Sequence, residues 1–148
     1  MLLGIDVGTS SIKGMLMEEN GRILAISARN YDVSFPKPNY AEQDPRMWWV
    51  RLCQVMGELQ RKCPRMKEDL QGIGLSGQMH GLVAIDKEGI PVRPAIIWMD
   101  QRATKELEEI KEKIPFSRQG EIFHNQVFNG FALSFVDEAG GAGFIRKN

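Results

Sequence analysis

The spacing of apolar residues predicts three consecutive strands at the start of the chain. Residues 2–7 form a short apolar run, and residues 11–17 form a second run after the polar turn 8–10. Asn20-Gly21 is a strong hairpin signal, and residues 22–30 would form the third strand. Two hairpins in succession predict an antiparallel meander.

Helical spacing of apolar residues then predicts two helices. After residues 33–44, which we expect to be an extended loop, Asp44-Pro45 is typical of a helix start, with an N-cap and a proline at the first helical position. Pro64 would end this first helix, and Pro115 would end the second one. The first apolar stripe consists of Trp49, Leu52, Cys53, Met56 and Leu59. The second consists of Ala103, Leu107, Ile110 and Ile114.

Two further strands are expected between these helices. Residues 70–75 would form a buried strand that leads through Gly77 into the turn Gln78-Met79-His80-Gly81, and residues 95–98 would form a short buried strand before Asp100. The order of elements is three antiparallel strands, helix, strand, turn, strand, helix. This order predicts a mixed α/β domain rather than a Rossmann unit, and the chain carries no Walker A motif.

Composition narrows the classes of partner. The 148 residues are enough for one domain with a core, and 19 basic side chains balance 19 acidic ones, so the formal net charge is zero. This balance argues against a charge-driven role on nucleic acids or membrane surfaces, and no apolar stretch is long enough to span a bilayer. Cys53 and Cys63 lack metal-site spacing. We therefore expect a cytoplasmic protein with reduced thiols.

The turn after the first strand is a candidate phosphate site. Gly8, Thr9 and Ser10 would present backbone N–H groups in one direction, which is how a nest binds phosphate oxygens. Lys13 lies just beyond, and Asp6 could hold a hydrated magnesium ion or orient water on it. Phosphoryl transfer depends on such positioning and charge stabilisation. The alternative is an ordinary hairpin turn in which Asp6 caps local amides.

A second group of polar residues follows the later strands. Gln78 and His80 can both donate and accept hydrogen bonds, as sugar hydroxyls require. Trp98 could stack on the apolar face of a sugar, and Asp100 and Arg102 could reach the same pocket. The alternatives are a structural role for His80, core packing for Trp98, and a surface ion pair near the helix start for Arg102.

These residues resemble the motifs of the FGGY carbohydrate kinases, and among them the xylulokinases, in which Gln-Met-His-Gly is characteristic. The matching stretches are 4–10 with Lys13, 40–45 with Trp48-Trp49, 72–81, and 93–98 with Asp100 and Arg102. The resemblance implies an actin-like, ribonuclease-H-like ATPase fold. It also implies two domains around a cleft, with the sugar deep in the N-terminal domain and ATP bound largely by the C-terminal one.

The resemblance also implies residue roles. Met79 and His80 would contact the ketose, Asp6 would serve the magnesium ion and the phosphate, and Asp100 would lie at the sugar site. Thr9, Ser10 and Lys13 would lie beside the transferred phosphate. Xylulokinases usually carry asparagine after the tryptophan, where this chain has Met99, so this wall of the sugar pocket departs from the family pattern.

The expected function is the N-terminal part of a kinase that transfers the ATP γ-phosphate to D-xylulose. The alternatives are a kinase for another pentulose or polyol, or a non-catalytic sugar-binding fragment. By the resemblance, the catalytic aspartate and the adenosine pocket would lie beyond residue 148, so the chain alone is expected to be inactive. Its missing partner would be the C-terminal kinase domain, and exposed surfaces make a homo-oligomer possible.

The end of the chain departs from the family pattern. We expect an incomplete kinase N-terminal domain over residues 1–133 and an unrelated tail over 134–148. One permitted choice of codons for the tail, read one nucleotide later, encodes R-L-W-M-K-R-E-E-P-D-L-Y-E-K, which resembles the helix expected there. This predicts a shift of the reading frame near Ser134.

Overall fold

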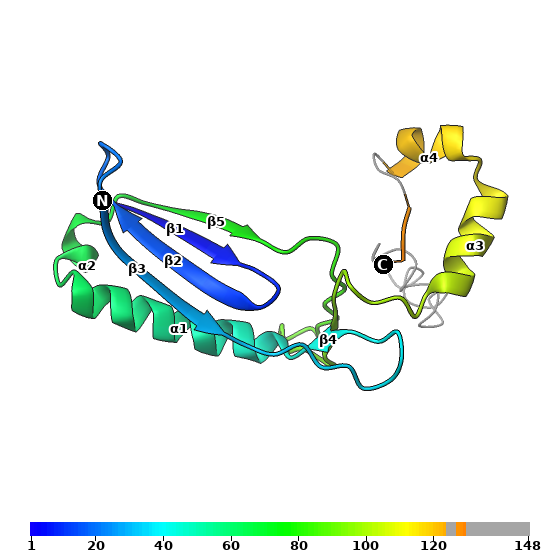
Figure 1. Ribbon diagram of the computed structural model, residues 1–148, viewed down its shortest axis with the longest axis horizontal. Coiled ribbons are helices and arrows are strands. Elements are labelled where there is room, and N and C mark those ends of the chain that lie inside the picture. Colours follow the sequence, from blue (N-terminus) through cyan, green and yellow to red (C-terminus); the bar gives the residue numbers. More distant parts are fainter. Residues whose placement is uncertain (124–126, 130–148) are drawn as a thin grey trace. The chain divides into compact units, whose positions relative to one another are not determined.

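The computed structural model describes residues 1–123 and 127–129, and the chain divides into two compact units (Figure 1). The first unit comprises residues 1–33 and 44–78, and the second comprises 34–43 and 79–148. Each unit has its own sheet, and the expected mixed α/β class is confirmed. The tail 134–148 lies outside the described residues, so the proposed frame shift stays a prediction.

The first unit is built on a four-stranded mixed sheet of order β3-β2-β1-β5. Its strands are β1 (Leu2–Val7), β2 (Ser11–Met17), β3 (Ile23–Asn30) and β5 (Gly72–Gly77). The first three pair antiparallel, which confirms the predicted meander, whereas β5 runs parallel to β1. A parallel neighbour needs a long crossover, and helix α1 (Pro45–Lys62) provides it.

Helix α1 packs against β2 and β3 (Figure 1). Its start is as predicted, because the Asp44 side chain accepts a hydrogen bond from the Arg46 backbone N–H at 3.0 Å. Gly14 permits the close packing: a Cβ there would lie 2.7 Å from Val55 Cγ1 and 2.9 Å from Leu59 Cδ1. The core of this unit is formed by Leu3, Ile5, Ile12, Leu16, Ala25, Tyr31, Val55, Leu59 and Met66.

The predicted apolar stripe of α1 is wrong in part. Trp49 is 68% exposed and Cys53 is also exposed, whereas Val55 is fully buried. Two overlapping series of positions in this helix have helical spacing, and contact with the sheet selects the one that contains Trp48, Leu52, Val55, Met56 and Leu59. Local spacing alone does not distinguish them.

The strand expected near residues 70–75 is present as β5, but its expected burial is wrong. Strand β5 is exposed along almost all its length, and Ile73 and Leu75 are 56% and 74% exposed. Both residues pair with core positions of β1, Leu3 and Ile5, so they share the face that α1 covers further along the sheet. Among the described residues α1 packs on β2 and β3, which leaves this end of the face uncovered. The short helix α2 (Met66–Asp69) precedes the strand.

The second unit is built around a small antiparallel pair, β4 (Glu42–Gln43) with β6 (Ala95–Ile96). Residues 95–97 are buried as expected, but Trp98 is 46% exposed. Residues 33–44 are not a simple loop, because β4 lies within them. The helices α3 (Thr104–Lys113) and α4 (Phe116–Phe123) follow. Within the described part of the chain, no helix has both the length and the apolar character needed to cross a membrane.

Candidate functional site

The candidate residues divide between the two units. Residues 6–13 and Gln78 belong to the first unit, whereas Met79, His80, Trp98, Asp100 and Arg102 belong to the second. The sequence grouped Gln78 with the sugar-binding residues, but the structure places it beside the first turn.

Three polar side chains lie in one row across strands β1, β2 and β5, close to the turn between β1 and β2. Asp6 lies opposite Lys13 in β2 and opposite Ser76 in β5. Paired residues point to the same face of a sheet, and neighbours along a strand alternate. Since Ile5 is in the core with α1, Asp6 and its two partners lie on the other face, and all three are exposed. Ser76 was not among the site residues predicted from the sequence.

Gln78 joins this turn through two contacts. Its backbone N–H donates to the Val7 carbonyl at 2.9 Å, and its side-chain oxygen accepts from the Thr9 hydroxyl at 3.3 Å. Gly77 makes this approach possible, because a Cβ there would lie 3.0 Å from the Val7 carbonyl oxygen. The end of β5 is thereby tied to the end of β1.

Tyr31 is a further residue at this turn that sequence reasoning missed. It is only 7% exposed, its hydroxyl donates to the Gly8 carbonyl, and its backbone N–H donates to the Ser10 carbonyl at 3.1 Å. Burial and the nearby charge of Asp6 raise the pKa of the Tyr31 phenol. The meander offered a signal, because it places the end of the third strand beside the start of the second.

The donor set at the turn fits a hydrated magnesium ion better than a protein-enclosed metal. No cluster of three or more His, Cys, Asp or Glu that could hold a metal occurs in the part of the chain that the structure describes. Magnesium commonly takes one or two carboxylates and completes its shell with water and phosphate oxygens. The exposed carboxylate of Asp6 can serve as such a single ligand.

In the second unit, His80 has an unusual backbone conformation. Its φ is 63°, in the left-handed region, which is uncommon for a residue other than glycine and stores strain. The following residues hold it, because Leu82 and Ile96 exchange backbone hydrogen bonds of 2.8 and 3.0 Å. The His80 ring meets Phe128 edge-on, with 5.0 Å between centroids. Met79 beside it is 71% exposed.

Asp100 is fully buried, and both of its oxygens accept hydrogen bonds. Oδ1 accepts from the backbone N–H and Nε of Arg102, each at 2.9 Å. Oδ2 accepts from the Ala41 N–H at 2.6 Å and from Arg102 Nη2 at 2.7 Å. The carboxylate therefore holds residues 39–41 against residues 100–102.

Arg102 extends this network to Glu42. Its guanidinium lies 2.6 Å from Glu42 Oε1, and Arg93 contacts the same oxygen at 2.9 Å. The surface ion pair considered for Arg102 is wrong, since its side chain is 4% exposed. Burial by itself would lower the pKa of Arg102, but the hydrogen bonds to Asp100 and Glu42 outweigh it and raise that pKa.

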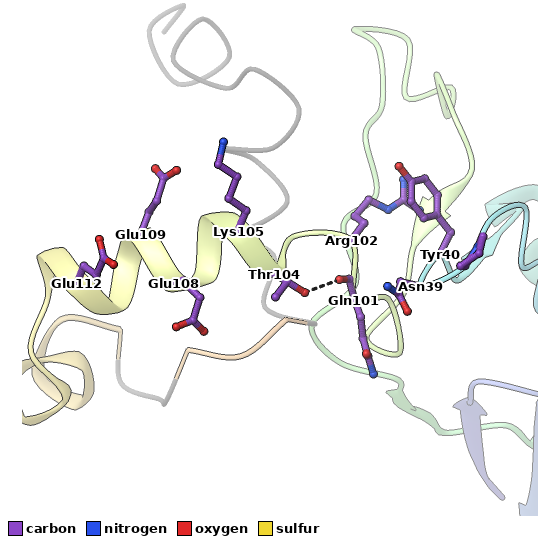
Figure 2. Close-up of a pocket in the computed structure, with 10 residues that line it drawn as sticks. Asn39, Tyr40, Gln101, Arg102, Thr104, Lys105, Glu108, Glu109 and Glu112 are labelled. Carbon is purple, nitrogen blue, oxygen red and sulfur yellow. Dashed lines mark hydrogen bonds between the residues drawn. The ribbon is translucent and has the colours of Figure 1, made fainter.

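A groove of about 630 Å³ lies beside this network (Figure 2). The Arg102 guanidinium carbon stacks 3.8 Å from the centre of the Tyr40 ring. Figure 2 shows glutamates of α3 along the same groove, a poor environment for an anionic phosphate. Its lining consists of Pro38, Asn39, Tyr40, Gln101, Arg102, Thr104, Lys105, Glu108, Glu109 and Glu112. Met79, His80 and Trp98 do not line it.

Comparison with known proteins identifies relatives over nearly the whole chain. Residues 1–137 match the model of the "FGGY family of carbohydrate kinases, N-terminal domain". The xylulose kinase of Lactococcus lactis is 42% identical over 132 residues, which cover 89% of this chain and 26% of that protein. The xylulose kinase of Staphylococcus xylosus is 37% identical over 132 residues, which cover 89% and 27%. The chain thus spans about a quarter of the length of these relatives.

Solved structures of sugar kinases also superpose on the chain. A xyloylose kinase from Brucella ovis superposes with a TM-score of 0.86 at 34% identity, covering 97% of this chain and 30% of that one. A xylulose kinase from Rhodospirillum rubrum also gives 0.86, at 25% identity, covering 95% and 29%.

Proposed function

Because the chain belongs to the FGGY family of carbohydrate kinases and has the actin-like ATPase fold of that family, we propose that it carries the sugar- and phosphate-binding groups of a D-xylulose kinase. One observation carries the proposal: the turn Gln78-Met79-His80-Gly81 holds its histidine in a left-handed conformation, in a chain 42% identical to a xylulose kinase. Strain of this kind clusters at functional sites.

We propose that the second unit supplies the sugar contacts. His80 hydrogen-bonds a ketose hydroxyl, Trp98 presents its half-exposed ring to the apolar face of the sugar, and Met79 adds an exposed apolar contact. Asp100 and Arg102 act as positioning residues, because both are buried and hydrogen-bonded to one another. Their effect on sugar binding passes through the segment 95–102.

We propose that the first unit supplies the phosphate contacts. Thr9 and Ser10 donate hydrogen bonds to a phosphate of ATP, Gly8 closes the turn through its N–H bond to the Ser11 carbonyl, and the ammonium of Lys13 opposes the negative charge of the phosphate. Asp6 holds a hydrated magnesium ion, which, when bound, neutralises charge on the phosphates. The proton acceptor for the sugar hydroxyl is proposed to lie in the part of the relatives that this chain does not span.

Calorimetric titration of the chain with D-xylulose, without ATP, tests the sugar site. We expect His80→Ala to weaken binding by roughly 2- to 12-fold, the loss that one hydrogen bond of about 0.5–1.5 kcal/mol corresponds to. His80→Asn is the matched control for the backbone, because asparagine also tolerates the left-handed region. Unchanged affinity in both variants would remove His80 from the site.

Met99 favours a second candidate, a kinase for another pentulose or polyol. This side chain is apolar and 39% exposed beside Trp98, whereas xylulokinases usually have an amide there. A titration panel of D-xylulose, D-ribulose and glycerol decides between the two: tightest binding of D-xylulose supports the first candidate, and tighter binding of another sugar supports the second. Restoring the amide with Met99→Asn shows whether this position sets the preference.

A further inference from the structure

We propose that Tyr31 is a positioning residue for the phosphate-binding turn, where its phenol fixes the orientation of the Gly8–Thr9 peptide. The inference rests on the proposed phosphate-binding role of this turn and adds a residue to it. Tyr31 itself touches neither phosphate nor sugar in this proposal. It acts through the backbone that does.

Two hydrogen bonds from Tyr31 hold the turn on both sides of Thr9. The phenol hydroxyl donates to the Gly8 carbonyl, and the backbone N–H donates to the Ser10 carbonyl at 3.1 Å. The Gly8 N–H donates to the Ser11 carbonyl at 3.0 Å and closes the turn. Backbone groups that are fixed in this way need no reorganisation when a ligand arrives, which favours binding.

The hydrogen bond from Tyr31 to the Gly8 carbonyl also sets the direction of the Thr9 N–H, because both groups belong to the same peptide bond. The described peptides are trans, so the carbonyl of Gly8 and the N–H of Thr9 point in opposite directions. Tyr31 belongs to the core cluster of the first unit, and the Gly8 carbonyl points toward its hydroxyl. The Thr9 N–H is therefore directed away from the core, where an anion can accept its hydrogen bond.

If the Gly8–Thr9 peptide rotated, the buried Tyr31 phenol would lose its hydrogen-bond acceptor, the Gly8 carbonyl. Tyr31 is 7% exposed, and a buried hydroxyl that loses its partner pays the full cost of desolvation. The phenol also stays protonated and remains a donor, because burial and the charge of Asp6 raise its pKa above the ordinary value. These features keep the turn in one orientation.

The test is a titration of the 148-residue chain with inorganic phosphate at constant ionic strength, followed by the 15N–1H signals of Thr9 and Ser10. In the wild-type chain we expect these signals to shift and saturate. In Tyr31→Phe we expect saturation at a phosphate concentration roughly 2- to 12-fold higher, the range for loss of one hydrogen bond. Tyr40→Phe is the matched control, because it changes the only other tyrosine and lies in the second unit.

A second measurement keeps the proposal testable should Tyr31→Phe fail to fold. In the Tyr40→Phe background the absorbance of tyrosinate reports Tyr31 alone. If phosphate binding requires the protonated phenol, linkage demands that phosphate raise the pKa of Tyr31. A folded Tyr31→Phe chain with wild-type phosphate affinity, or a Tyr31 titration that phosphate leaves unchanged, overturns the proposal. If phosphate does not shift the 15N–1H signals of Thr9 and Ser10 in the wild-type chain, the turn does not bind phosphate. The proposed positioning role of Tyr31 is then overturned as well.

Discussion

The buried carboxylate of Asp100 gives the sharpest prediction. Asp100→Asn keeps the shape of the side chain but replaces one oxygen by an NH₂ group. Both oxygens now accept from N–H donors of Ala41 and Arg102, so either orientation of the new amide sets donor against donor. The variant also removes the charge that faces the Arg102 guanidinium.

The magnitude follows from burial. Removing one partner of a buried ion pair typically costs about 3–5 kcal/mol, because the other charge is left uncompensated. Here Glu42 still contacts Arg102 at 2.6 Å, so we expect a loss near the lower end, about 3 kcal/mol. The perturbation acts on the second unit, whose segments 39–41 and 100–102 the carboxylate joins.

Urea unfolding measures the loss, and hydrogen exchange at the Ala41 amide localises it. We expect this amide to exchange faster in Asp100→Asn, because either orientation of the new amide destabilises the contact between segments 39–41 and 100–102, and one of them also removes the acceptor of the Ala41 N–H. Arg93→Met is the matched control: it removes another partner of Glu42, but one that is 37% exposed, and should cost no more than about 1 kcal/mol. Stability within about 1 kcal/mol of the wild type, with unchanged exchange at Ala41, would refute the reasoning.

Three further predictions concern the first unit. Gly14→Ala should lower the free energy of unfolding in urea by about 1–3 kcal/mol, because its Cβ would lie 2.7 Å from a valine methyl of α1. Gly57→Ala is the control: a Cβ there meets nothing within 4 Å, so this variant should raise the free energy of unfolding by about 0.5–1 kcal/mol. Equal effects of the two substitutions would contradict this prediction. The Glu58 pKa is lowered from 4.5 to about 2, chiefly by a hydrogen bond from Lys62, so its stabilising contribution is complete above pH 4.5 and is lost as the pH falls toward 2. Glu58→Gln should reduce the dependence of the melting temperature on pH over this range. A pH dependence equal to that of the wild type would count against the role of Glu58. The exposed apolar strand β5 lies at the edge of its sheet and is expected to promote self-association at high concentration. Leu75→Lys places a charge on this strand and should shift size-exclusion elution toward the monomer. Identical elution of the variant and the wild type would exclude β5 from self-association.

Local chemistry explains which elements could be predicted. The meander and the start of α1 depend on turn and capping residues that lie next to each other in the sequence, and both were confirmed. The face of α1 was predicted wrongly because Trp49 and Val55 belong to overlapping stripes, and only contact with the sheet chooses between them. Burial of residues 70–75 was predicted wrongly because an apolar run does not reveal whether another element covers it.

The candidate site shows the same division. Residues 6–13 were found from one short turn, and His80 was found from a strand-end turn with glycine on each side. Tyr31 was missed, since its partner Gly8 is 23 residues away in the sequence. Arg102 was assigned to the sugar pocket, with a surface ion pair as the alternative, and its burial was not predicted because its second partner, Glu42, lies 60 residues away.

The sequence by itself determined the family, the three-stranded meander, the helices α1 and α3 and the candidate turns, because motifs, hydrophobic spacing and turn chemistry are local properties of the chain. Only the tertiary structure decided that Asp100 and Arg102 form a buried network with Glu42 and that Tyr31 holds the Gly8 turn. Burial and charge pairing depend on which distant segments meet, and several pairings satisfy the same local pattern. The packing of the folded chain selects one of them.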